Sequence, residues 1–351
     1  MVTAALPRDG APPLAVGALP APYLLFLGDV TEPGYAKTAF GLRDWAGERC
    51  VGEWALPGAT VTTGLPRLSP EAAVAAGARA LVIGVASPGG VIPDSWLGAL
   101  RAALEAGLDL VAGMHSRLAA LPGLAAAAER LGRRLHDVRV PSARIPVASG
   151  ARRPGKRLLT VGTDCALGKK YTALALARAF AARGVDATFR ATGQTGIMIA
   201  GEGMPIDAVV ADFVAGAAEL LSPAASPGHW DVIEGQGSLF HPAYAGVSLG
   251  LLHGSQPDVF VVCHDPTRAG ILGHEALPLP AIEQVVAQTQ ALGRVTNPAI
   301  RCAGVSLNTA ELREAEAAAE MARTAERLGL PAADPLRGGA AFDRLVDACL
   351  A

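Results

Sequence analysis

The stretch VGTDCALGKKYT, residues 161–172, decides the fold of the C-terminal part of this chain. It overlaps the apolar run 157–162, which is typical of a buried strand, and leads into an Ala- and Leu-rich run that predicts a helix ending at Gly184. A glycine-rich turn between a strand and a helix, with a lysine after its last glycine, is the setting of a phosphate-binding loop. We therefore expect a P-loop α/β domain.

The loop departs from the common P-loop pattern in two ways. Five residues separate its two glycines instead of four, a spacing that resembles the dethiobiotin-synthetase-like branch of the P-loop fold. Lys170 stands where a triphosphatase has the hydroxyl that ligates Mg²⁺, and the next such hydroxyl is on Thr172. Because an ammonium group repels a cation and attracts phosphate, we expect a polyphosphate ligand without metal. The predicted cofactor-binding residues are Gly162, Thr163, Asp164, Cys165, Ala166, Leu167, Gly168, Lys169, Lys170, Tyr171 and Thr172.

Length and charge narrow the class of protein. A chain of 351 residues is long enough for two domains. Its net charge of -2, without a basic run interleaved with aromatics, argues against a nucleic-acid partner. No apolar run is long enough to span a bilayer, and the Pro- and Ala-rich residues 1–22 lack the features of a signal peptide. Five scattered cysteines suggest neither a disulfide framework nor a metal site. We expect a cytoplasmic homo-oligomer that binds no metal.

The remaining pattern predicts a second α/β domain before the loop. Apolar runs at 23–30, 80–86, 109–114 and 134–140 are typical of buried parallel strands, and helices are expected from about Asp94 and over 122–132. The glycine-rich turn 84–90 does not match a dinucleotide-binding fingerprint. We predict a flexible tail at 1–22, a Rossmann-like domain at 23–141, a linker at 142–155 and a P-loop domain at 156–351.

Three residues are candidates for a catalytic base. Glu234 ends the apolar run in HWDVIEGQG, although a structural capping role is an alternative. Residues 206–216 have helical apolar spacing, and Asp212 lies within the apolar face of that expected helix, whereas Asp207 is expected to be a cap or a solvated acid. His253 is the third candidate, although a lone histidine is more often structural.

Polar residues near the expected ends of strands are candidates for substrate binding. The carboxyl ends of parallel strands form the binding edge of an open sheet, so the segment 190–196 is expected to face the P-loop. The predicted substrate-binding residues are Arg190, Gln194, Thr195, Gln236 and Arg268. Cys165 could be a nucleophile at a helix N-terminus, but the sequence offers it no obvious base.

Longer segments resemble a known family. GTDCALGKKYTALAL, ATGQTGIMIAGEGMPIDAVVADFVAGAAE and WDVIEGQGSLFHPAYAGVSLGLLHGSQPD are similar to the P-loop family of unknown function whose characterised members are D-glutamate N-acetyltransferases. GVASPGGVIPDSW and GLDLVAGMHSRL resemble its N-terminal Rossmann-like domain. The resemblance implies transfer of an acetyl group from acetyl-CoA to the α-amine of an acidic amino acid, with D-glutamate as the first expectation for this small-molecule substrate.

Within that resemblance, residue roles are hypotheses. The loop amides with Lys169 and Lys170 would bind the phosphates of CoA. Glu234 is the first choice of base, ahead of Asp212 and His253, and Arg190 or Arg268 would bind the substrate carboxylates. The alternative is an Mg-ATP-dependent kinase or ligase of the dethiobiotin-synthetase type. The third hypothesis is that the protein is a non-catalytic nucleotide sensor.

Overall fold

The computed structural model describes residues 18–85, 90–141 and 144–351. These divide into two compact units. The Rossmann-like unit contains the described residues of 15–143 together with 193–205, and the P-loop unit contains those of 144–192 and 206–351. Most of the tail predicted at 1–22 and most of the turn at 84–90 therefore lie outside the described residues.

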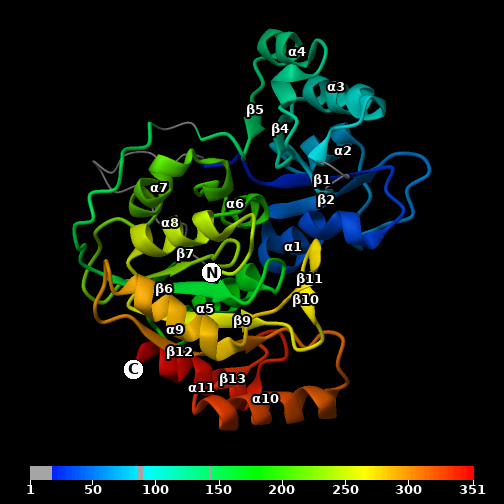
Figure 1. Ribbon diagram of the computed structural model, residues 1–351. Coiled ribbons are helices and arrows are strands. Elements are labelled where there is room, and N and C mark those ends of the chain that lie inside the picture. Colours follow the sequence, from blue (N-terminus) through cyan, green and yellow to red (C-terminus); the bar gives the residue numbers. More distant parts are fainter. Residues whose placement is uncertain (1–17, 86–89, 142–143) are drawn as a thin grey trace. The chain divides into compact units, whose positions relative to one another are not determined.

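The Rossmann-like unit is built on a five-stranded sheet (Figure 1). All its strand pairs are parallel, in the order β2-β1-β3-β4-β5. The strands are β1 (Tyr23–Gly28), β2 (Cys50–Ala55), β3 (Ala80–Ile83), β4 (Asp109–Ala112) and β5 (Leu135–Asp137). The helices are α1 (Lys37–Ala46), α2 (Pro70–Ala75), α3 (Leu97–Ala106), α4 (Leu124–Leu131) and α6 (Gln194–Ala200). Four of the strands and two of the helices were predicted from the sequence.

The sequence pattern missed β2. This strand carries Glu53 at its centre, and that side chain is only 1% exposed. Its carboxylate accepts hydrogen bonds from the hydroxyls of Thr62 and Thr63 and from the Thr63 amide. A buried carboxylate with three such donors is compatible with a strand interior, but hydropathy does not reveal the donors.

The P-loop unit is built on a six-stranded parallel sheet in the order β13-β12-β9-β6-β8-β7. The strands are β6 (Lys156–Gly162), β7 (Ala187–Arg190), β8 (Trp230–Ile233), β9 (Val259–His264), β12 (Arg301–Leu307) and β13 (Ala332–Ala333). The helices are α5 (Lys169–Ala182), α7 (Val214–Leu221), α8 (Ala245–Ser255), α9 (Ile282–Gly293), α10 (Glu314–Leu328) and α11 (Gly339–Leu350). A short antiparallel hairpin, β10 (Gly270–Ile271) and β11 (His274–Pro278), follows β9.

Both faces of this sheet are covered, which explains why its strands read as continuous apolar runs. Leu158 of β6 packs in a core with residues of α5 and α11, including Phe180 and Val346. Its neighbour Leu159 lies on the other face, where α8 and α9 contribute Leu251 and Val285. The central position of β6 places the loop that follows it at the middle of the sheet's carboxyl edge.

The prediction of a helix over 206–216 is wrong. The chain there forms two short 3-10 turns, Ile206–Ala208 and Ala211–Phe213, and α7 begins only at Val214. Asp207 and Asp212 are both exposed on these turns. The adjacent residues Val209 and Val210 lie between the two turns, and β-branched side chains lower helix propensity.

The described part of the segment predicted as a linker packs along the P-loop unit. The amides of Ser149 and Gly150 both donate to the carboxylate of Glu219 on α7. Arg153 donates to the carbonyls of Ser222 and Gly254. The spacing of prolines and glycines correctly indicates irregular backbone here, but it does not reveal these anchoring hydrogen bonds. Among the described residues, no helix is both long and apolar enough to cross a membrane.

Candidate functional site

The phosphate-binding loop lies between β6 and α5, as its glycine pattern predicts. Two of its residues, Ala166 at φ 54° and Gly168 at φ 99°, have left-handed backbone conformations. Glycine adopts this conformation readily, whereas alanine does so at a cost of about 1 kcal/mol. The backbone turns sharply enough to begin α5 at Lys169. The N-terminus of this long helix, with its positive dipole end, favours a negatively charged ligand.

Lys169 is buried directly beneath the loop, at 6% exposure. Its Nζ donates to the carbonyl oxygen of Asp164 over 2.6 Å, and burial lowers the pKa of its ammonium group. A methyl group added to Gly235 would lie 1.7 Å from the Thr160 carbonyl and 3.1 Å from Cδ of Lys169, so only glycine fits there. The lysine is thus held in one place, and a bound anion would stabilise its charge.

The buried carboxylate of Asp164 stabilises the loop through hydrogen bonds. It is fully buried and accepts from the amides of Cys165 at 2.6 Å and Leu272 at 2.8 Å. Nη1 of Arg268 donates to the same carboxylate at 2.9 Å and to the Cys165 carbonyl at 2.7 Å. Arg268, predicted to bind substrate, therefore already supports the loop, while 22% of its side chain remains exposed.

The first Ser or Thr hydroxyl after the loop lysines, that of Thr172, points into the protein interior and not toward a ligand in the loop. The Thr172 side chain is 2% exposed and lies in the interior, with its Oγ1 2.7 Å from Oγ of Ser306 and 3.2 Å from the Gly168 carbonyl. Lys170 is half-buried, and its Nζ lies 4.3 Å from the centre of the Tyr171 ring. The Mg²⁺-ligating hydroxyl of the common pattern is therefore not replaced by Thr172.

Glu234 is placed at the carboxyl end of β8, next to the strand that carries the loop. It is 5% exposed, and one carboxylate oxygen accepts from the Thr192 amide at 3.0 Å. The Thr192 hydroxyl donates to the Glu234 carbonyl at 2.7 Å and accepts from the Gln236 amide group at 2.9 Å. Glu234 and Gln236 thus belong to one network at the predicted binding edge.

Arg190 is directed away from that edge. Its Nε donates to Asp231 over 2.6 Å. Since Arg190 pairs in register with Ile233, and Asp231 pairs with Thr188, the guanidinium reaches back along the sheet. The ion pair accounts for the charge of Arg190 without a substrate.

Gln194 and Thr195 begin α6 and belong to the Rossmann-like unit. The Thr195 hydroxyl lies 3.0 Å from that of Thr38 on α1, within the same unit. Their predicted contact with substrate stays a prediction.

The other two candidate bases have different surroundings from Glu234. Asp212 is exposed on its 3-10 turn. His253 lies in the last turn of α8, and its Nε2 is 3.1 Å from the carbonyl of Leu292 on α9. A contact between two packed helices is a sufficient structural reason for this histidine.

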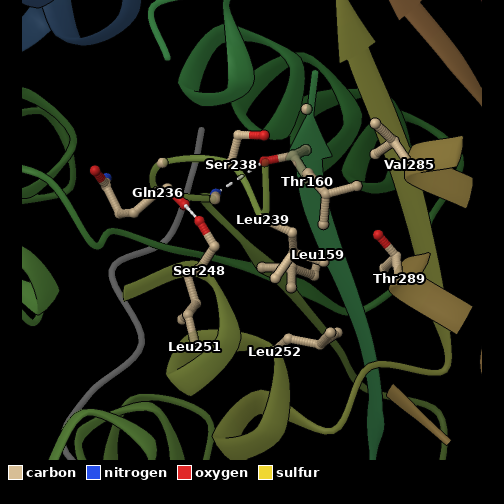
Figure 2. A pocket seen from close by; sticks show the side chains of 14 residues that line it. Leu159, Thr160, Gln236, Ser238, Leu239, Ser248, Leu251, Leu252, Val285 and Thr289 are labelled. Atoms are coloured by element: carbon tan, nitrogen blue, oxygen red, sulfur yellow. Dashed lines mark hydrogen bonds between the residues drawn. The ribbon is translucent and has the colours of Figure 1, made fainter. Parts of the chain in front are cut away.

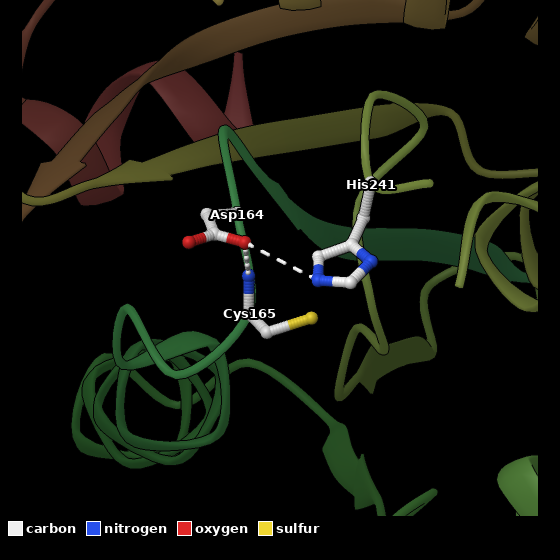
Figure 3. Close-up of side chains that lie close together, drawn as sticks. All are labelled: Asp164, Cys165 and His241. Carbon is white, nitrogen blue, oxygen red and sulfur yellow. Dashed lines mark hydrogen bonds and ion pairs between the residues drawn. The ribbon is translucent and has the colours of Figure 1, made fainter. Parts of the chain in front are cut away.

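Sequence reasoning missed the grouping of His241 with the loop (Figure 3). Ligand-type atoms of Asp164, Cys165 and His241 all lie within 4.8 Å of one another. Burial raises the pKa of the Cys165 thiol, while the nearby Lys169 and Arg268 act in the opposite direction. The only sequence signal was the position of His241 in the loop after β8, which the parallel order of strands brings beside β6.

A cavity of about 20 Å³ lies on the α8 and α9 side of β6 (Figure 2). Its walls include Leu159, Leu251 and Val285, and the buried Thr289 hydroxyl has no hydrogen-bond partner among the described residues. This volume is about that needed for one water molecule. The cavity is too small for an amino acid or a nucleotide, so the exposed loop edge is the better candidate for substrate binding.

Comparison with known proteins agrees with the two units. Residues 146–346 match the family model described as a domain of unknown function, the DUF1611 C-terminal P-loop domain, and residues 48–141 match the DUF1611 N-terminal Rossmann-like domain. A crystal structure of a DUF1611 family protein from Anabaena variabilis has a TM-score of 0.82 and 35% identity, covering 93% of this chain and 99% of that one.

Two relatives share the name D-glutamate N-acetyltransferase. The protein from Tritonibacter scottomollicae is 51% identical over 330 residues, 94% of this chain and 98% of the relative. The protein from a Pseudoalteromonas species is 46% identical over 318 residues, 91% of this chain and 96% of the relative. With both domain models matched in order and these relatives aligned along nearly their full length, the chain belongs to the DUF1611 family.

Proposed function

We propose that this protein transfers the acetyl group of acetyl-CoA to the α-amine of D-glutamate. The observation that carries this proposal is the 51% identity to a relative named D-glutamate N-acetyltransferase, along almost the whole of both chains. Its Rossmann-like and P-loop domains follow in the order expected for the family.

The loop has the chemistry needed for the phosphates of CoA. Its backbone amides precede α5, the buried ammonium of Lys169 lies beneath it, and Lys170 follows. Phosphate groups bind well to helix N-termini and to lysines without a metal ion. The inward position of Thr172 favours this reading over Mg-ATP, because the loop offers no Ser or Thr directly after Lys169 to ligate Mg²⁺.

Acetyl transfer also requires a base and a charge partner for the substrate. The amine must lose a proton as its nitrogen attacks the thioester carbonyl, and the CoA thiolate leaves. Glu234 is our proposed base because it alone among the three candidates lies beside the loop strand in a buried carboxylate position. The exposed part of Arg268 is our proposed partner for a substrate carboxylate, since its guanidinium already lies at the loop.

The test is an assay of thiol release from acetyl-CoA, with the product identified by mass spectrometry. D-glutamate, L-glutamate and D-aspartate are compared at equal concentrations, each with and without EDTA. We expect CoA release and N-acetylglutamate with D-glutamate in both buffers. Absence of CoA release with every acidic amino acid, together with amino-acid-dependent hydrolysis of Mg-ATP, would favour the kinase or ligase alternative.

A further inference from the structure

His241 is held in a single orientation beside the phosphate-binding loop. Its ring is 2% exposed and stacks on Tyr244, with centroids 4.5 Å apart and planes inclined by 28°. His274 of β11 packs against it edge-on at 5.4 Å. These contacts prevent the ring from turning and fix the direction of both nitrogen atoms.

The contacts also determine which ring nitrogen carries the proton. The backbone amide of Ala243 lies 3.1 Å from Nδ1 of His241, and an amide N–H can only donate. Nδ1 is therefore the acceptor, and the neutral ring carries its hydrogen on Nε2. A charged ring would need hydrogens on both nitrogens and would place an N–H against the Ala243 N–H.

The Nε2–H group is directed at the loop without a hydrogen-bond partner. Oδ1 of Asp164 lies 4.0 Å from Nε2, which is beyond hydrogen-bond length (Figure 3). That oxygen already accepts from the Cys165 amide at 2.6 Å. Nε2 makes no hydrogen bond with any residue that the structure describes. A donor beside the loop that no described residue satisfies is open to a ligand acceptor.

A metal ion does not suit this group of side chains. Coordination through Nε2 would require the hydrogen to move to Nδ1, where the Ala243 N–H opposes it. The Arg268 guanidinium, 2.9 Å from Asp164, already provides positive charge to the carboxylate. Burial also favours the protonated thiol of Cys165, which is a poor ligand. The arrangement suits an uncharged or negatively charged acceptor better than a cation.

We propose that His241 is a catalytic residue that donates a hydrogen bond from Nε2 to the carbonyl oxygen of the acetyl thioester. This inference rests on the proposed function. When the substrate nitrogen forms its bond to the carbonyl carbon, the carbonyl π electrons move to the oxygen, and the Nε2–H group stabilises that oxyanion. Collapse of the oxyanion re-forms the C=O bond and breaks the C–S bond, with CoA leaving as the thiolate. The ammonium proton goes to the separate base.

The charges around His241 are compatible with an oxyanion. Asp164 is the nearest carboxylate, and the Arg268 guanidinium together with the amides of Cys165 and Leu272 compensates its charge. The buried ammonium of Lys169 is attached to the same loop, through the Asp164 carbonyl. The remaining ring neighbours, Tyr244 and His274, contact the faces and edge of the imidazole. His241 thus acts as a neutral donor, not as the base.

The decisive experiment compares two substitutions of His241 in the full-length protein. His241→Phe keeps an aromatic ring for Tyr244 but has no donor, whereas His241→Gln retains a side-chain N–H near the position of Nε2. We expect kcat to fall by about 100- to 1,000-fold in His241→Phe, with the acetyl-CoA KM changed less than about threefold. His241→Gln should retain at least about ten times the activity of the Phe variant. His115→Phe, at an exposed histidine of the Rossmann-like unit, is the control and should keep kcat within about twofold.

A second measurement does not depend on turnover. Nitrogen NMR of the neutral ring should show the His241 hydrogen on Nε2. A neutral ring with its hydrogen on Nδ1 would overturn the inference, as would wild-type kcat in a folded His241→Phe variant. If the wild type releases no CoA with any acidic amino acid, the proposed function and the catalytic role fail together. An active wild type with an unaffected Phe variant refutes the role of His241 alone.

Discussion

The hydroxyl groups of Thr172 and Ser306 lie 2.7 Å apart in the interior of the P-loop unit. Thr172 is the first Ser or Thr after the loop lysines, and this contact directs its oxygen toward β12. The position that ligates Mg²⁺ in a triphosphatase is occupied by Lys170 instead. The pair therefore supports the central proposal that the loop binds a CoA phosphate without a metal ion.

Replacing Thr172 should affect stability. Thr172→Val leaves the buried Ser306 hydroxyl without this partner, and we expect a loss of about 1 to 3 kcal/mol in the free energy of unfolding. Urea denaturation measures it. Thr172→Ser should cost less because it keeps the hydroxyl, and adding Ser306→Ala to the Val variant should recover part of the loss. A Val variant as stable as the wild type would contradict the hydrogen bond.

Lys170→Thr separates phosphate binding by the lysine from metal binding by a hydroxyl. If Lys170 contacts a CoA phosphate, its loss should raise the acetyl-CoA KM by roughly tenfold with little change in kcat, as a charged hydrogen bond of about 1.5 kcal/mol implies. Steady-state kinetics at several acetyl-CoA concentrations measure this. Lys156→Thr, at the opposite end of β6, is the control and should change KM less than about twofold. If Lys170→Thr gained binding of Mg-ATP, the loop would differ from a triphosphatase loop mainly by the missing hydroxyl at position 170.

Arg268 should be important for the shape of the loop as well as for substrate binding. Arg268→Ala leaves the fully buried Asp164 carboxylate with two backbone donors, and we expect a loss of about 2 to 4 kcal/mol in stability. The exposed ion pair between Arg327 and Glu283 provides a matched control, and Arg327→Ala should cost no more than about 1 kcal/mol. Equal effects of the two substitutions on thermal or urea unfolding would show that Arg268 does not hold the loop.

His229 should make stability depend on pH. Hydrogen bonding to Asp231, with a further contribution from Asp186, raises the pKa of His229 despite its burial. A raised folded-state pKa means that this stabilisation is fully present below the unfolded value of about 6.5 and is lost as pH rises through the folded value. The stability difference between wild type and His229→Gln should therefore shrink from about pH 6 to pH 9. A difference that grows with pH would contradict the charged His229–Asp231 pair.

The sequence predicts the framework of this fold because hydropathy and glycine carry local information. Buried parallel strands such as β6 and β9 appear as apolar runs, and Gly162 and Gly168 mark the loop between β6 and α5. The predicted loop lysines and Glu234 follow directly from their positions after strands. Local pattern was therefore sufficient to locate the centre of the candidate site.

The missed features depend on contacts distant in the sequence. Glu53 is compatible with β2 only because Thr62 and Thr63 satisfy its carboxylate. Arg190 is drawn away from the binding edge by Asp231, 41 positions later. His241 approaches the loop through the strand order of the sheet, and its tautomer depends on the Ala243 amide. Apolar periodicity contains none of this hydrogen-bonding information.

Calorimetric titration of the full-length protein with acetyl-CoA, in EDTA and in excess Mg²⁺, tests the central claim most directly. Lys169→Met removes the buried ammonium beneath the loop while keeping most of the side-chain volume that packs on Gly235. The metal-free phosphate site predicts the same affinity in both buffers and at least about a tenfold loss in folded Lys169→Met. Unchanged acetyl-CoA affinity in Lys169→Met, or tight binding of ATP that requires Mg²⁺, would contradict it.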